Sequence, residues 1–118
     1  MRVAAVMEDL LLYSRIESAA RVSAVSLVRV NTPAALPADA ADLPDLVLVD
    51  WSAREPAWTD VLRAYTRPRI ILFGQHTDLA AHADARAAGL GPMWARSKLL
   101  GELPRLLVHP PQTAEQQN

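Results

Sequence analysis

DLVLVDWSAREP, residues 45–56, places four consecutive aliphatic residues directly before an aspartate and a tryptophan. An apolar run without polar alternation is typical of a strand that is buried on both faces, as in a parallel sheet covered by helices. Asp50 then follows the carboxyl end of this strand, where ligands and reactive groups gather in open parallel sheets. The stretch therefore predicts a central strand over 46–49 and makes Asp50 a candidate functional residue.

Similar apolar runs occur at four other places in the chain. We expect them to form strands over 4–7, 25–30, 70–73 and 93–95. Between them, apolar residues recur at helical spacing and predict helices over 10–21, 56–65, 79–87 and 101–108. The segment 32–44 contains three prolines, so any helix there should be short or irregular. Strands alternating with helices predict an α/β fold with a parallel sheet between two helical layers.

Details of two helices follow from single residues. In the third helix, Leu79, Ala83 and Ala87 form a stripe of small residues, with Thr77 or Asp78 as the cap and Gly89 at the end. In the second helix Pro56 should stand in the first turn, and in the last helix Pro104 should do the same.

The totals limit what kind of protein this is. A chain of 118 residues with 51% hydrophobic residues, 21% charged residues and a net charge of −1 fits one globular domain without a nucleic-acid-binding surface. We expect the domain over 1–109 and a flexible tail over 110–118. The absence of cysteine excludes disulfides and thiol chemistry. No run is long enough to span a membrane, and we expect a cytoplasmic protein.

Three carboxylates follow strand ends: Glu8 and Asp9 after the first strand and Asp50 after the third. If they meet at one sheet edge, they repel one another unless a positive charge is present, and Mg²⁺ is an ion that prefers oxygen ligands. The alternative is that each acid caps or begins the next helix. For all three together we favour a metal or phosphoryl site.

These features resemble the receiver domain of bacterial response regulators. The resemblance rests on the acidic pair, the Asp-Trp that ends the third strand, and ARAAGLGPMWARSK at 85–98, and it covers about residues 2–108. It implies a flavodoxin-like three-layer α/β/α fold with strand order 2-1-3-4-5. It also implies that Asp50 accepts a phosphoryl group from a sensor histidine kinase or another phosphodonor protein. Mg²⁺ would be held by Asp9 and Asp50, by Glu8 through water, and by the backbone carbonyl of Ser52.

The chain departs from the receiver pattern at three positions. Gly74 stands where the family has Ser or Thr, Met93 where it has an aromatic residue, and Arg96 where it has lysine. Gly74 and Arg96 are therefore the candidates for contact with a phosphoryl group. Because all three acids are present, we favour an atypical receiver in two-component signalling with Asp50 as phosphoacceptor. The alternative is a pseudo-receiver that binds or dimerises with partners without phosphorylation.

In either case we expect no enzyme but a domain that acts by docking to a downstream protein. A homodimer would use the face that holds Ala81, Ala85, Trp94 and the leucines near Leu99. We expect no nucleic-acid or membrane partner. A flavin- or cobalamin-binding domain on the same scaffold is less favoured, because Glu8 and Asp9 would repel a phosphate-bearing cofactor.

Overall fold

The computed structural model describes residues 1–108, so His109 and the predicted tail over 110–118 lie outside the described residues. Five strands form a single parallel sheet in the order β2-β1-β3-β4-β5. Their bounds are β1 Arg2–Val6, β2 Ser26–Val30, β3 Leu46–Asp50, β4 Arg69–Gly74 and β5 Trp94–Ala95. The predicted flavodoxin-like α/β fold and its strand order 2-1-3-4-5 are confirmed.

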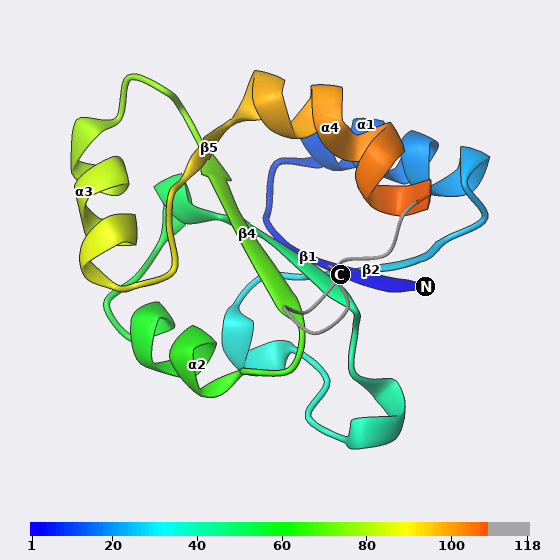
Figure 1. Ribbon diagram of the computed structural model, residues 1–118, viewed down its shortest axis with the longest axis horizontal. Helices are drawn as coiled ribbons and strands as arrows, with labels where there is room; N and C mark the ends of the chain where they lie inside the picture. Colours follow the sequence, from blue (N-terminus) through cyan, green and yellow to red (C-terminus); the bar gives the residue numbers. More distant parts are fainter. Residues whose placement is uncertain (109–118) are drawn as a thin grey trace, which may run out of the picture.

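Four α-helices cover the sheet on both faces (Figure 1). They are α1 Leu10–Val22, α2 Trp58–Ala64, α3 Leu79–Ala87 and α4 Arg96–Val108. Helices α1 and α4 pack on one face and α2 and α3 on the other, so two separate clusters of buried side chains flank the sheet. None of the described helices has both the length and the apolar character needed to cross a membrane.

The central strand β3 is buried along its whole length, as the apolar run predicted. Its side chains alternate between the two clusters: Leu46 and Leu48 contact the α1 and α4 side, while Val47 and Val49 contact the α2 and α3 side. Burial on both faces explains why the sequence here has no polar alternation.

The connection from β2 to β3 contains no α-helix. In its place the chain makes two short 3-10 turns, η1 at Pro33–Ala35 and η2 at Ala40–Asp42. This agrees with the prediction from its proline content, because proline in a helix interior removes a hydrogen bond and clashes with the preceding turn. One face of the sheet is therefore covered near β2 by turns instead of a helix.

The predicted stripe of small residues on α3 does not face the core. Leu79 is 76% exposed and Ala83 and Ala87 are also exposed, whereas Ala81 and Ala85 are fully buried against the sheet. In a helix that is mostly alanine, side-chain hydropathy hardly distinguishes the faces, so the sequence pattern did not indicate which face packs against the sheet. The Asp78 side chain does cap this helix by accepting the backbone N–H of Ala81, and Gly89 has the positive φ of 73° expected after its end.

Two helix starts also differ from prediction. Helix α4 begins at Arg96, five residues earlier than predicted, so Pro104 lies inside the helix and not in its first turn. Helix α2 begins at Trp58, which leaves Pro56 in the turn before it. Buried Leu99 and Leu103 explain the early start of α4, because their packing against the sheet stabilises an extra turn that local propensity did not predict.

Candidate functional site

Residues Asp50 and Trp51 follow each other at the end of β3 and point to opposite sides of the sheet. Strand side chains alternate, so the Asp50 carboxyl lies on the side of α1 and α4. The Trp51 indole lies on the side of α3, where it is almost fully buried. The carboxyl edge of the sheet thus carries a charged group on one side and a packed aromatic ring on the other.

Asp9 and Asp50 meet on the α1 and α4 side through an arginine. Arg96, the first residue of α4, places its Nη1 atom 3.6 Å from Asp9 Oδ2 and its Nη2 atom 3.8 Å from Asp50 Oδ2. Both distances exceed those of good hydrogen bonds, so the contacts are attractions between charges without close bonding. One guanidinium therefore lies between two carboxylates and leaves the group with one net negative charge.

The other oxygen of Asp9 has a structural role. Asp9 Oδ1 accepts the backbone N–H groups of Leu11 and Leu12 at 3.1 Å each and so caps α1. The capping alternative is therefore correct for this residue, although its second oxygen still faces Arg96. The structure brings Asp9 and Asp50 together and shows Glu8 as an exposed residue without a described ion pair.

Asp50 is buried, with 5% of its surface exposed. Burial raises the pKa of its carboxyl above the ordinary value, and the charge of Asp9 raises it further; the Arg96 guanidinium and the Ser52 backbone N–H oppose this rise. Within residues 1–108, Asp50 Oδ1 and Arg96 Nε are buried atoms that have no hydrogen-bond partner. The pair formed by Asp50 and Arg96 therefore leaves one hydrogen-bond acceptor, Asp50 Oδ1, and one donor, Arg96 Nε, without a partner.

The other two predicted site residues, Ser52 and Gly74, lie next to each other. Ser52 Oγ accepts the backbone N–H of Gln75 at 3.2 Å. A Cβ atom at Gly74 would lie 2.4 Å from Ser52 Oγ and 2.9 Å from Met93 Sδ. The space that a side chain at the end of β4 would need is thus filled by the Ser52 hydroxyl and the Met93 thioether.

The residues at this edge, as arranged, do not fit a magnesium site. Within the described chain, no group of three His, Cys, Asp or Glu side chains is placed to hold a metal ion. Arg96 already supplies positive charge between the two carboxylates, and Mg²⁺ requires near-octahedral oxygen coordination. Magnesium would have to displace the guanidinium, and its binding stays a prediction.

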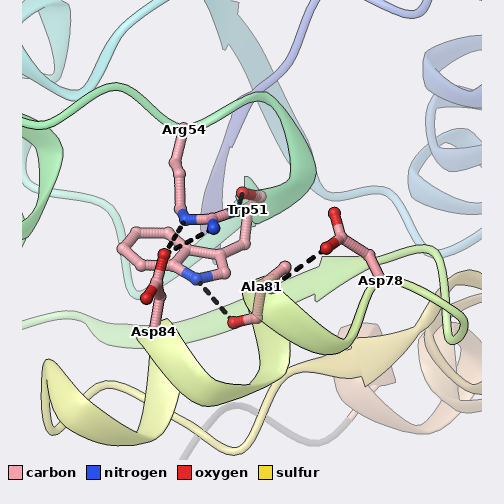
Figure 2. Close-up of polar contacts among 5 residues, drawn as sticks. All are labelled: Trp51, Arg54, Asp78, Ala81 and Asp84. Carbon is pink, nitrogen blue, oxygen red and sulfur yellow. Dashed lines mark hydrogen bonds and ion pairs between the residues drawn. The ribbon is translucent and has the colours of Figure 1, made fainter.

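A second polar group, on the opposite side, was missed by the sequence analysis (Figure 2). Arg54 lies 5.6 Å from the centre of the Trp51 ring, its Nε atom donates to Asp84 Oδ2 at 2.9 Å, and its Nη1 atom donates to the Trp51 carbonyl. The Trp51 Nε1–H donates to the Ala81 carbonyl at 3.1 Å. These contacts hold Trp51, the residue that follows Asp50, against α3. No local pattern could reveal them, because the partners are 30 residues apart.

The surface predicted for a homodimer contains buried residues. Ala81, Ala85 and Leu99 are fully buried in the core, and Trp94 is partly buried beside Lys98, whose Nζ atom lies 4.6 Å from the ring centre. These alanines and the leucine cannot contact a partner, so this part of the prediction was wrong.

Comparisons with known proteins support the fold. No protein-family model matches the sequence, and no curated protein matches it. Among solved structures, the chain is similar to one described as a CpaE2 pilus assembly protein from Sinorhizobium meliloti 1021, with a TM-score of 0.57 and 14% sequence identity. The similarity covers 89% of this chain and 98% of the other. The five-stranded parallel fold thus fits a receiver-like domain, and at this identity the likeness shows the fold alone.

Proposed function

We propose that this chain is a pseudo-receiver, a receiver-like signalling domain that acts by docking to other proteins without accepting a phosphoryl group. The observation that carries the proposal is the position of Arg96 between Asp9 and Asp50. In a receiver of the ordinary kind, a metal ion and a phosphoryl group would need access to these carboxylates. Here a side chain of the protein itself neutralises much of their charge.

The surroundings of Asp50 support the same proposal. Phosphoryl transfer depends on groups that position and neutralise the phosphoryl oxygens. At the end of β4, Gly74 offers no side-chain hydroxyl, and the nearby Ser52 hydroxyl is engaged by the Gln75 N–H. The Arg96 guanidinium, which could contact phosphoryl oxygens, is paired with Asp9 and Asp50. The similarity to the CpaE2 pilus assembly protein supports only the fold in this proposal.

One observation favours the second candidate, a receiver that still uses Asp50 as phosphoacceptor. Asp50 Oδ1 has no hydrogen-bond partner among the described residues, so an oxygen of the right type is available at the right strand end. In that case a sensor histidine kinase or another phosphodonor protein would be the partner, and Mg²⁺ the cofactor. Arg96 would then move aside or contact the phosphoryl oxygens.

Phosphorylation by a small donor distinguishes the two candidates. The full chain is incubated with acetyl phosphate and MgCl₂, and its intact mass is measured for the wild type, Asp50→Asn and Asp60→Asn, the last being an exposed acid on α2. We expect no phosphoryl adduct on any of the three. An adduct on the wild type and Asp60→Asn that is absent from Asp50→Asn would establish the phosphoacceptor and overturn the pseudo-receiver.

Magnesium titration tests the role given to Arg96. We expect no magnesium-dependent change in tryptophan fluorescence for the wild type, because the guanidinium lies between the carboxylates. Arg96→Gln removes the positive charge, and Asp9 and Asp50 should then bind Mg²⁺ more tightly than in the wild type. Equal magnesium affinity in the two proteins would show that Arg96 does not take the place of a metal ion.

A further inference from the structure

Strand β2 forms one edge of the sheet. Within residues 1–108 it pairs only with β1, in parallel. The Ser26 N–H donates to the Met1 carbonyl, and the Val30 carbonyl accepts the Met7 N–H. The N–H and C=O groups of one strand residue point to the same side, and successive residues alternate, so Ser26, Val28 and Val30 face β1. The backbone groups of Leu27 and Arg29 therefore point away from the sheet.

The face of the sheet beside this edge is covered by turns and not by a helix. A helix would normally connect β2 to β3, but here two 3-10 turns replace it. Val28, which lies on the same face of the strand as the partly buried Val30, is 47% exposed. An open edge with unpaired backbone groups and an exposed β-branched residue is a ready template for another strand.

We infer that β2 is an interaction surface for a second copy of this chain, which pairs its own β2 antiparallel across a two-fold axis at Val28. In this register Leu27 faces Arg29 of the other copy, and these are the residues whose backbone groups point outward. Each such pair exchanges both N–H···O=C bonds, which is the hydrogen-bonded pair of an antiparallel ladder. The backbone groups that point outward thus set the register. In this register the N–H and C=O groups of Leu27 and Arg29 all have a partner.

The side chains also fit this register. Val28 meets Val28 of the second copy in a non-hydrogen-bonded pair, the position where opposing side chains are closest, and each covers part of the other. Arg29 faces a leucine and not another arginine, so no like charges oppose each other. Its guanidinium is already held, because Nη1 donates to the Met7 carbonyl and to Asn31 Oδ1. The second copy is favoured as the partner because the strand is complementary to itself.

The pairing is expected to be weak and reversible. Two five-residue strands bury much less than the roughly 1,200 Å² of a typical stable complex. The dimer should therefore form at high protein concentration and dissociate on dilution. This inference goes beyond the proposed function and does not rest on it.

Disulfide cross-linking tests the register, because the chain contains no cysteine of its own. In Val28→Cys, the two thiols should lie across a non-hydrogen-bonded pair, close enough for a disulfide after small adjustments. Leu79→Cys is the matched control, since Leu79 is also exposed but lies on α3 after β4. Under a mild oxidant, Val28→Cys should form a covalent dimer much faster than Leu79→Cys. Equal rates would overturn the inference.

Sedimentation equilibrium gives an independent measurement. Val28→Lys places two like charges opposite each other and should weaken dimerisation by about tenfold or more, whereas Val28→Thr and Leu79→Lys should dimerise as the wild type does. Unchanged melting temperatures would show that the variants are folded. The wild type could instead stay monomeric while the Leu27 and Arg29 amides are protected from hydrogen exchange. This result would show that something other than a second copy covers the edge, and it would overturn the inference.

Discussion

Gly74→Ala is the substitution that most directly tests the packing at the end of β4. The added Cβ would lie 2.4 Å from Ser52 Oγ, about 1 Å inside the ordinary contact distance of roughly 3.5 Å. Ser52 has to rotate away, and the Gln75 N–H then loses its acceptor. Met93 has to move as well, because its Sδ atom lies 2.9 Å from the new carbon.

The cost can be divided into two parts. Loss of the hydrogen bond to Ser52 should cost about 1 kcal/mol, and overpacking against the flexible Met93 about 1 kcal/mol more. Gly74→Ala should therefore lower the free energy of unfolding by about 2 kcal/mol and Ser52→Ala by about 1 kcal/mol. In the double variant the hydrogen bond is lost only once, so it should be no less stable than Gly74→Ala alone.

Urea denaturation followed by tryptophan fluorescence measures all three variants. The sum of the single effects would be about 3 kcal/mol, so the expected coupling is about 1 kcal/mol. Gly101→Ala is the control, because nothing lies within 4 Å of its new Cβ in α4, and it should increase stability by about 0.5 to 1 kcal/mol. Additive effects of Gly74→Ala and Ser52→Ala would refute the idea that the Ser52 hydroxyl fills the place of a β4 side chain.

Two further predictions concern buried polar groups. Because the pKa of Asp50 is raised above its ordinary value of 3.8, the folded chain holds this proton to higher pH than the unfolded chain, and stability falls as pH rises through that interval. Asp50→Asn should remove this fall, so the variant should be more stable than the wild type at neutral pH and equally stable below about pH 4. Thermal melts across this pH range measure the difference. A variant that is less stable than the wild type at neutral pH would contradict the raised pKa of Asp50. Trp51→Phe should lower the free energy of unfolding by about 1 kcal/mol more than Trp58→Phe does. The reason is that Trp51 Nε1 donates to the Ala81 carbonyl, while Trp58 Nε1 has no partner among the described residues. Equal midpoints of urea denaturation for the two variants would contradict this.

The sheet was predictable because its strands carry strong local signals. The apolar run at 46–49 has no polar alternation, and in the structure β3 is buried on both faces. The same alternation of side chains puts Met93 and Trp94, which are neighbours in the sequence, into different clusters. The inward face of α3 was not predictable from hydropathy, because most of its residues are alanines.

The candidate site was only partly predictable. The order of elements places Asp9 and Asp50 at neighbouring strand ends, since β1 and β3 are paired, and this brought them together as expected. The sequence could not show that Arg96 would reach both acids, because that depends on where α4 begins, and the packing of Leu99 and Leu103 decides that start. The contact between Arg54 and Asp84 likewise exists only after α3 has docked.

Arg96 is both the partner of Asp50 and the first residue of α4, and this dual position links the acid to the last helix. By thermodynamic reciprocity, any event that changes the charge of Asp50 must change the stability of the first turn of α4. Equally, any protein that binds α4 and shifts its first turn must change the proton affinity of Asp50. A change at Asp50 can therefore reach α4 without a movable aromatic side chain, because the Arg96 guanidinium contacts Asp50 and Arg96 is the first residue of α4.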